Sequence, residues 1–313
     1  MTSEATRIRG VLTPVCTPFD RGLRPDAQRL VRQCRWLLDQ DVGLAVFGTN
    51  SEANSLAASE KLALLDALLA AGLPAGRMMP GTGACSISDA TLLTRHAVEN
   101  GVAGVLMVPP FYYKGVSDDG LFRHFSEVIQ RVGDSRLRIY LYHIPPVAQV
   151  GIPLALIERL LAAYPGTIAG VKDSSGDWAN TNAMLERFQP RGFDVFAGSE
   201  AFLLATLSGG GAGCISATAN VNPGPIATLA RKWKEPDADA RQEALSALRA
   251  VFQKFPMIPA LKAAIAHYAA DPDWAIVRPP LVELDDAQRA ALVQSLRAAD
   301  FTMPGLEKVH ETA

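Results

Sequence analysis

Eight short apolar runs, separated by stretches with helical spacing, are the feature that most restricts how this 313-residue chain folds. The runs are continuous rather than alternating, which is typical of parallel strands covered on both faces. Strict alternation of strand and helix, repeated eight times, predicts a closed (β/α)₈ barrel, the TIM barrel of the α/β class. A doubly wound open sheet is the competing architecture, but no GxGxxG turn follows the first run. The eight runs span 10–17, 43–49, 77–83, 104–109, 138–145, 168–173, 193–198 and 213–217.

The stretches between the runs predict helices. In 26–40, for example, Leu30 and Cys34 recur at the spacing of one helix face. Beyond the eighth run the strand signal stops, and only helical patterns follow. We therefore expect a catalytic barrel over 1–230 and a C-terminal helical extension over 231–313 that packs on it. The expected helices span 26–40, 59–71, 88–100, 118–131, 153–163, 177–188, 199–207, 223–234, 238–254, 257–269 and 285–299.

Composition argues against several classes of protein. The formal net charge of −2 lacks the basic excess that is usual in nucleic-acid-binding proteins. No window of 18 apolar residues occurs, so we expect no membrane span, and the polar stretch 1–10 does not resemble a signal peptide. The four cysteines form no CxxC pair, and no cluster of His, Asp and Glu is evident. We expect reduced thiols, a cytoplasmic protein and no metal site.

Barrel enzymes carry their active sites at the carboxyl ends of the strands, and one lysine is prominent there. Lys172 is the only one of the eight lysines that falls within an apolar run, Ile-Ala-Gly-Val-Lys-Asp. Burial disfavours the charged form of an amine, and the neutral amine is the form that attacks a carbonyl. The alternative is a structural lysine paired with Asp173 or Glu200, because ion pairs also place lysines at strand ends.

Other strand ends contribute polar candidates. The turn 48–51 (Gly-Thr-Asn-Ser) offers backbone N–H groups and hydroxyls that suit a carboxylate, although helix capping alone also explains it. Tyr142, on the strand next to that of Lys172, is placed to move protons, unless it is an ordinary aromatic at the barrel rim. His143 is an acid–base candidate, but a lone histidine at the rim is more often structural. The run 209–213 (GGGAG) fits either a phosphate site or a simple turn, and we favour the turn.

Seven short motifs occur in order along the chain, each at or near the end of an expected strand. They are Thr17-Pro18-Phe19, Gly48-Thr49-Asn50-Ser51-Glu52, Gly81-Thr82-Gly83, Pro110-Phe111-Tyr112-Tyr113, Tyr142-His143-Ile144-Pro145, Gly170-Val171-Lys172-Asp173 and Gly213-Cys214-Ile215-Ser216. Together they resemble the dihydrodipicolinate synthase / N-acetylneuraminate lyase family of pyruvate-handling, Schiff-base class I aldolases. The resemblance covers about residues 8–300, and it rests on the order and placement of the motifs rather than on any single one.

The resemblance implies roles for the candidate residues. Lys172 is the expected Schiff-base lysine, and Tyr142 is the expected acid–base and proton-relay group. Tyr113 matches a tyrosine that this family inserts into the site of a neighbouring subunit, which implies a homo-oligomer, commonly a dimer of dimers. Further substrate contacts are expected from strand-end residues, namely His143, Gly198, Glu200 and Ser216.

The turn 48–51 corresponds to the family's GTTGE or GSTGE turn, which is expected to hold the pyruvate carboxylate. Gly48 and Thr49 match that pattern directly. Asn50 stands where the family usually has Thr or Ser, and Ser51 stands where it has Gly. The resemblance therefore implies a carboxylate pocket of altered shape.

One departure from the family pattern concerns the second substrate. In dihydrodipicolinate synthases the corresponding tyrosine begins a segment like YNVPxRTG, whose arginine grips the carboxylate of aspartate semialdehyde in a bidentate contact. Here the segment begins at Tyr142 and the arginine position holds Val147, with no arginine between Arg138 and Arg159. This places the chain nearer to the lyase and aldolase members, whose second substrates are sugar acids or other 2-oxo acids.

We expect a lyase or aldolase that cleaves a 4-hydroxy-2-oxo acid reversibly to pyruvate and an aldehyde, or a dehydratase that uses the same Schiff base. The expected partner is a small 2-oxo acid. No cofactor is expected, because the protonated imine serves as the electron sink. The alternatives are a true 4-hydroxy-tetrahydrodipicolinate (dihydrodipicolinate) synthase and a catalytically silent barrel that binds 2-oxo acids. A further alternative, a barrel that binds a phosphosugar or a flavin, is supported only by the glycine-rich run 209–213.

Overall fold

Seven parallel strands form one curved sheet with the order β2–β1–β7–β6–β5–β4–β3. The structure, a computed structural model, describes residues 7–307. Every pair of neighbouring strands is parallel, as expected for strands joined by helical crossovers. The strands are β1 (Gly10–Thr13), β2 (Gly43–Leu44), β3 (Val105–Met107), β4 (Ile139–His143), β5 (Ile168–Asp173), β6 (Asp194–Ala197) and β7 (Gly213–Ile215).

An irregular segment, 78–82, lies between the two edge strands β2 and β3 and closes the barrel. The N–H of Gly81 donates to the C=O of Val46 at 2.7 Å, and the N–H of Leu106 donates to the C=O of Pro80 at 2.9 Å. The sequence predicts a full strand here, but the segment makes only isolated parallel bridges. Pro80 has no N–H to donate, and this interrupts the ladder. The predicted barrel fold is confirmed, with this segment in the place of one strand.

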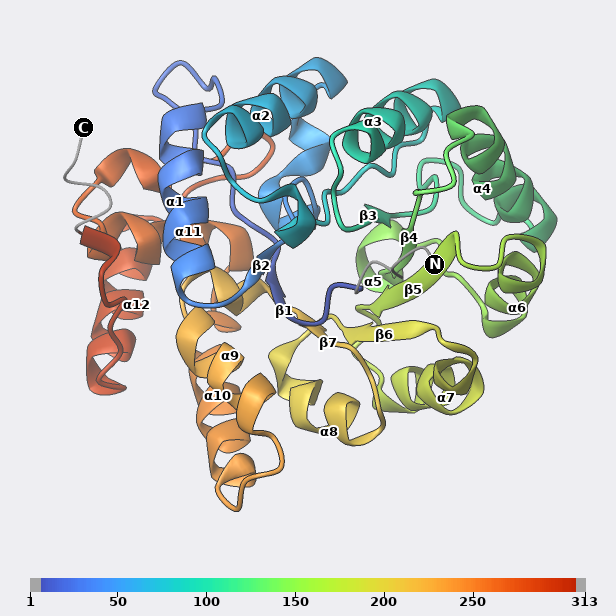
Figure 1. Ribbon diagram of the computed structural model, residues 1–313. Helices are drawn as coiled ribbons and strands as arrows, with labels where there is room; N and C mark the ends of the chain where they lie inside the picture. The colour runs from blue at the N-terminus through green and yellow to red at the C-terminus, as the bar shows by residue number, and fades with distance from the viewer. Residues whose placement is uncertain (1–6, 308–313) are drawn as a thin grey trace.

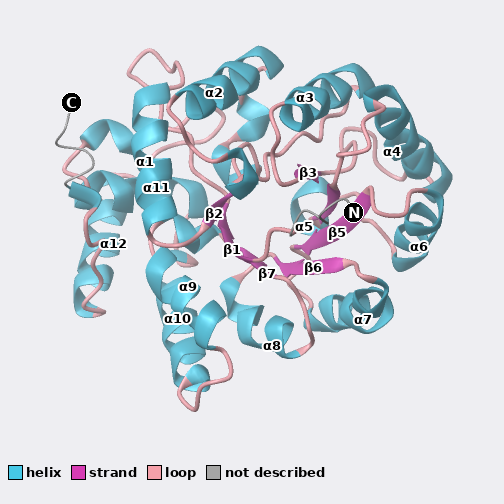
Figure 2. Cartoon of the chain, viewed as in Figure 1, coloured by secondary structure: helices cyan, strands magenta, loops and turns pink. Residues whose placement is uncertain are grey.

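Helices surround the sheet on its outer side (Figures 1 and 2). Several of them begin with a side-chain cap; for example, the Asp26 carboxylate accepts the N–H of Arg29 at 2.9 Å. The four-residue helix α5 is not predicted by the sequence pattern, and the predicted helix 199–207 is a short 3₁₀ turn followed by α8. The helices are α1 (Ala27–Asp39), α2 (Ala58–Ala70), α3 (Ile87–Glu99), α4 (Asp118–Val132), α5 (Pro145–Ala148), α6 (Leu154–Ala163), α7 (Trp178–Phe188), α8 (Leu203–Ser208), α9 (Pro223–Lys232), α10 (Ala238–Phe252), α11 (Met257–Tyr268) and α12 (Asp286–Ala298).

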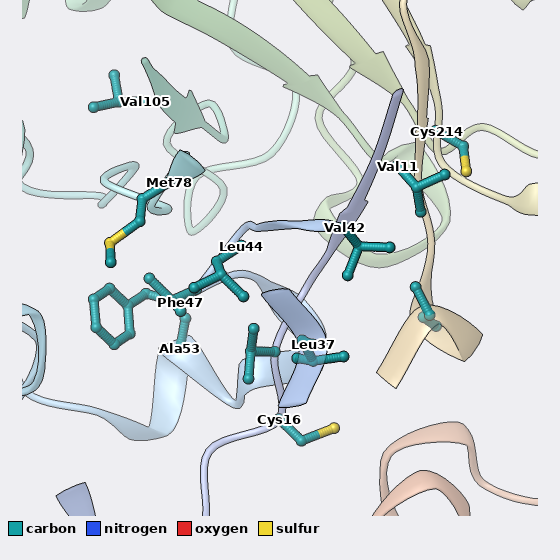
Figure 3. Close-up of a cluster of buried hydrophobic side chains, with 14 of the residues drawn as sticks. Val11, Cys16, Leu37, Val42, Leu44, Phe47, Ala53, Met78, Val105 and Cys214 are labelled. Atoms are coloured by element: carbon teal, nitrogen blue, oxygen red, sulfur yellow. The ribbon is translucent and has the colours of Figure 1, made fainter. Parts of the chain in front are cut away.

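The strands separate two hydrophobic clusters, one inside the barrel and a larger one between the strands and the helices. Figure 3 shows part of the larger, outer cluster. Leu12 belongs to the inner cluster and its neighbour Val11 to the outer one, because successive residues of a strand point to opposite faces. By the same alternation Tyr142 is part of the inner cluster and Val171 part of the outer cluster. Lys172, next to Val171, therefore faces the barrel interior.

The C-terminal helices α10, α11 and α12 lie on one side of the barrel (Figure 1), where they pack against one another and α10 packs against α9. Leu245 of α10, Leu261 of α11 and Leu292 of α12 all belong to the outer hydrophobic cluster of the barrel. The expected boundary at residue 230 falls in the last turn of α9 and stays a prediction. Within residues 7–307, no helix has the length and apolar character needed to cross a membrane.

Candidate active site

Lys172 and Tyr142 are paired across the neighbouring strands β5 and β4. Both are buried, and the Lys172 Nζ lies 4.1 Å from the centroid of the Tyr142 ring. Among residues 7–307, no carboxylate lies within ion-pair distance of this amine. The Asp173 carboxylate instead accepts the hydroxyl of Thr181 at 2.6 Å, and Glu200 is paired with Arg249 at 2.8 Å. The amine is thus held beside an aromatic ring near the carboxyl ends of the strands, where barrel enzymes carry their active sites. Its neighbour Tyr142, rather than Lys172 itself, lines the adjoining cavity.

The turn that follows β2 approaches the same place. The N–H of Gly48 donates to the Ser51 hydroxyl at 3.2 Å, and the Thr49 hydroxyl lies 3.2 Å from the Tyr142 hydroxyl. The turn is bracketed by Phe47 and Glu52, whose φ angles are 63° and 55°. Left-handed backbone at non-glycine residues is uncommon and is concentrated at functional sites. The turn brings a backbone N–H, two hydroxyls and the tyrosine together.

A cavity of about 110 Å³ opens beside the turn, and both Thr49 and Tyr142 line it. This volume is several times the roughly 10–15 Å³ that one water requires, so a molecule of a few heavy atoms fits. Its wall carries no charged side chain, and Asn54 is its remaining polar side chain. Most of the wall is apolar and is formed by Phe47, Leu106, Val108, Phe111, Ile144 and Val147, together with small residues.

The exposed position of Val147 bears directly on the missing arginine. Its side chain lines the cavity and is 59% exposed, so the site opens towards solvent at this point. Two other cations near the rim already have partners: Lys114 donates to the C=O of Ala148 at 2.8 Å, and Arg278 pairs with Glu60 at 2.6 Å. Arg278 is thus neutralised by a carboxylate, whereas the Lys114 ammonium donates to a neutral carbonyl and keeps its charge at the rim.

His143 is held by the backbone. Its Nδ1 accepts the N–H of Ile152 at 2.9 Å, which requires that nitrogen to be unprotonated. Burial lowers the pKa of His143 below its ordinary value, and the nearby Asp173 carboxylate opposes this shift. The ring is not part of the cavity wall. A neutral imidazole that fixes the chain after β4 is the role that this geometry supports.

Glu200 and Ser216 are brought together, but away from the cavity wall. Both are buried, and the Glu200 carboxylate accepts the hydroxyls of Ser216 and Thr218 and the guanidinium of Arg249. Gly198 precedes this cluster. A Cβ at Gly198 would lie 2.0 Å from the Ser174 hydroxyl oxygen, so only glycine fits at this close approach. These predicted contacts form a polar network between β6, β7 and α10.

Tyr113 and Asn50 lie outside the cavity wall. Tyr113 is 74% exposed and packs edge-to-face on Tyr112, which is equally exposed. An exposed aromatic pair of this kind is typical of a surface that meets another protein. Asn50 is half-buried within the turn.

The glycine-rich run 209–213 lies at the opposite end of the barrel from Lys172, because it precedes β7. A Cβ at Gly213 would come within 1.8 Å of the C=O of Gly10 on β1, so strand packing requires this glycine. Within the part of the chain that the structure describes, no three His, Cys, Asp or Glu side chains are grouped as metal ligands.

Lys262 and Glu52 form a fully buried ion pair directly behind the turn, with Nζ and Oε1 2.6 Å apart. The sequence places Lys262 on a helix without assigning it a function. The available signal was a single lysine within Met257–Tyr268, a helix that is otherwise almost entirely apolar. A lone charge in such a segment indicates a buried, paired group.

Known proteins resemble the chain over almost its whole length. A model of the dihydrodipicolinate synthetase family matches residues 7–299. An uncharacterized DapA-like lyase of Chloroflexus aurantiacus is 32% identical over 91% of this chain and 94% of that protein. Dihydrodipicolinate synthase from Agrobacterium tumefaciens has a TM-score of 0.86 at 32% identity, covering 93% of this chain and 99% of that chain. YagE from E. coli K12, solved in complex with pyruvate, has a TM-score of 0.84 at 27% identity, covering 94% and 99%.

These similarities extend from the first described strand to the C-terminal helices, so they include every element that contributes to the site. They do not distinguish a synthase from a lyase, since both names occur among the relatives. The chain belongs to the dihydrodipicolinate synthetase family and is a class I, pyruvate-dependent lyase or aldolase.

Proposed function

We propose that this enzyme cleaves a 4-hydroxy-2-oxo acid reversibly to pyruvate and an aldehyde through an imine on Lys172. The observation that carries the proposal is the buried Lys172 amine, which lies against Tyr142 and has no ion-pair partner among residues 7–307. An amine in this setting is suited to attack a carbonyl rather than to hold a structural charge. The solved complex of YagE with pyruvate supports pyruvate as the 2-oxo acid product.

The proposed chemistry needs only side chains of this chain. The Lys172 amine adds to C2 of the substrate, and the Tyr142 phenol gives its proton to the carbinolamine hydroxyl, so that water leaves and an iminium forms beside the Tyr142 phenolate. The phenolate takes the proton of the C4 hydroxyl, C3–C4 breaks, and the electron pair moves to the imine nitrogen as the aldehyde departs. Tyr142 then returns this proton to C3 of the enamine, and addition of water to the resulting iminium releases pyruvate and the free amine and restores the phenol. No cofactor is proposed, because the iminium is the electron sink.

Tyr142 has a route for its proton. Its hydroxyl lies 3.2 Å from the Thr49 hydroxyl, slightly longer than an ideal O–H···O bond. Catalytic hydrogen bonds of this kind often shorten when substrate binds. We therefore assign Thr49 to the proton relay. We also assign the turn to the substrate carboxylate: Gly48 and Thr49 line the cavity, and Asn50 and Ser51, which do not line it, complete the turn behind them.

The cavity wall favours an aldehyde with an uncharged tail. It holds no charged side chain, and Val147 stands where a carboxylate-binding arginine would be needed. Aspartate semialdehyde would bring its carboxylate against a wall that has no charged side chain, at a considerable desolvation cost, and Lys114 at the rim is a point charge without the bidentate geometry of arginine. The synthase reaction is therefore the second candidate, and the dehydratase variant remains open on the same imine.

We also propose a cytoplasmic dimer of dimers in which Tyr113 enters the site of a neighbouring subunit. The 74% exposed pair of Tyr112 and Tyr113 supports such a contact. All four cysteines are free, as expected for a reducing compartment.

Borohydride trapping tests the mechanism. Reduction in the presence of pyruvate should leave a stable adduct on Lys172, identified by mass spectrometry of the digested protein. Lys172→Ala is the matched negative control, because it removes the proposed nucleophile. A label on a different lysine, or none, would exclude the proposed mechanism. An adduct without turnover of any 4-hydroxy-2-oxo acid would favour the silent binder.

A further inference from the structure

The ion pair between Lys262 and Glu52 joins the C-terminal extension to the carboxylate turn. Lys262 is on α11, and Glu52 is the residue that ends the turn, 210 positions earlier in the chain. Both side chains are 0% exposed, and Nζ lies 2.6 Å from Oε1. A buried ion pair adds little net stability on average, because desolvation offsets the attraction. What such a pair can supply is a fixed geometry.

Both members of the pair make further contacts. The Lys262 Nζ donates to the C=O of Thr17 at 2.9 Å and lies 4.5 Å from the Phe19 ring centroid. The second Glu52 oxygen accepts the N–H of Arg278 at 2.8 Å. Burial lowers the pKa of Lys262, and the Glu52 carboxylate acts in the opposite direction. The carboxylate is therefore held from two sides by groups of the C-terminal extension.

The backbone of Glu52 needs such support. Its φ of 55° and ψ of 35° are left-handed, a conformation that costs a non-glycine residue of order 1–3 kcal/mol. Glu52 is bonded to Lys262 and Arg278, neither of which belongs to the barrel strands. These contacts supply the constraint that a strained conformation requires.

A second path runs from Lys262 to the turn through Thr17. The Thr17 hydroxyl donates to the C=O of Ser51 at 2.7 Å, and the Ser51 hydroxyl in turn accepts the N–H of Gly48. Both ends of the turn are thus connected to one buried ammonium. The same turn carries Thr49, which reaches the Tyr142 hydroxyl.

We propose that Lys262 is a positioning residue that holds the turn 48–52 in its carboxylate-binding shape through Glu52 and Thr17. Lys262 does not line the cavity, so it acts through these two residues rather than on substrate. The inference rests on the proposed function, because it assumes that this turn receives the substrate carboxylate. The C-terminal extension is then part of the substrate-binding machinery.

The test compares a ketone that has a carboxylate with one that lacks it. Borohydride trapping on Lys172 is measured against concentration, with pyruvate and with acetone, for wild type and Lys262→Met. We expect the half-saturating pyruvate concentration to rise by at least about tenfold, since small misplacements of a binding group are costly, while acetone trapping stays within about twofold. A merely structural lysine would lower both reactions together, in proportion to the folded fraction.

Two further variants make the result decisive. The double variant Glu52→Gln/Lys262→Met leaves no uncompensated buried charge, so it should fold even if the single variant does not. It should show the same selective weakening of pyruvate trapping, with acetone trapping kept. Asp194→Asn is the control, because Asp194 is a buried acid at the opposite end of the barrel, bonded to Tyr140. It should keep the pyruvate-to-acetone ratio of wild type.

The outcomes separate the two proposals. If wild type traps pyruvate on Lys172 and the double variant has an unchanged pyruvate-to-acetone ratio, the positioning role of Lys262 is wrong and the proposed function stands. If wild type traps no pyruvate on Lys172, the proposed function itself fails, and the positioning role fails with it.

Discussion

The Lys172 amine lies 4.1 Å from the centre of the Tyr142 ring, and the two residues are paired across β5 and β4. Register in a parallel sheet is set by the backbone ladder, so this proximity does not depend on flexible loops. Placement on rigid strands is how catalytic groups are held to the tolerance that proton transfer and bond formation require. Because both residues lie on the sheet, each of them can be replaced singly and its contribution to the reaction measured.

Replacing Tyr142 by Phe removes the hydroxyl next to Thr49 and keeps the ring beside Lys172. We expect the variant to bind pyruvate and to lose turnover by about 10²–10⁴-fold, the usual value of positioned proton transfer. Steady-state cleavage and borohydride trapping, measured on one preparation, separate the two effects. Turnover within a few-fold of wild type would mean that another group moves the proton.

A Val147→Arg variant should gain activity with aspartate semialdehyde. Val147 lines the cavity and is 59% exposed, so a longer side chain has room to extend at the mouth. A charge-assisted hydrogen bond is worth roughly 1.5–3 kcal/mol, so two of them correspond to about two or more orders of magnitude in kcat/KM. The comparison is kcat/KM for the semialdehyde and for a neutral-tailed 4-hydroxy-2-oxo acid.

Val147→Met is the control for side-chain length without charge, and it should gain nothing with the semialdehyde. The same kcat/KM comparison on the wild-type enzyme tests the assignment as a lyase rather than a synthase. If wild type already uses aspartate semialdehyde far better than any 4-hydroxy-2-oxo acid, the synthase is the correct function.

Subunits that carry Lys172→Ala and Tyr113→Phe should complement each other when mixed. If each site takes its lysine from one subunit and Tyr113 from a neighbour, some hetero-oligomers contain an intact site. Tyr112→Phe is the matched control, since Tyr112 is equally exposed and packs on Tyr113. It should keep activity on its own. Activity that stays at the level of the separate variants, after subunit exchange is verified by mass, would contradict a shared site.

His143 should make the fold sensitive to mild acid. Burial lowers its folded pKa, so below the unfolded value of about 6.5 the unfolded chain binds a proton that the folded chain does not. Stability is therefore full above about pH 6.5 and falls as the pH drops towards the folded pKa, by up to ~1.4 kcal/mol per pH unit. Protonation of Nδ1 also breaks the bond from the Ile152 N–H.

His143→Asn should reduce this loss, because the amide oxygen accepts the same N–H and carries no proton. Urea unfolding at about pH 7.5 and about pH 5.5 gives the free energy of unfolding at each pH, and the difference between the two values is the loss of stability. Some acid sensitivity should remain, since burial also lowers the pKa of His124. The exposed His267→Asn should behave as wild type does. An equal loss in His143→Asn and wild type would show that His143 does not titrate in this range.

Local pattern was enough to predict the barrel, most helix positions and the location of Lys172 at a strand end. These features depend on residues that are close in sequence: continuous apolar runs report burial on both faces, and 3.6-residue spacing reports a helix. The irregular segment 78–82 is the main departure within the barrel. Pro80 marked it locally, but its bridges to β2 and β3 depend on strands that are distant in sequence.

Contacts between distant segments were decided by the tertiary structure alone. Lys262 reaches Glu52 across 210 positions, and Arg249 reaches Glu200 across 49. Neither pairing has a local signature, because each depends on how helices outside the barrel pack against strand ends. The neutral state of His143 likewise depends on the backbone of Ile152, which only the folded chain brings to its Nδ1. The sequence by itself determined which chemical groups the site has available, and packing determined which of them face the substrate cavity and which are occupied in holding it in shape.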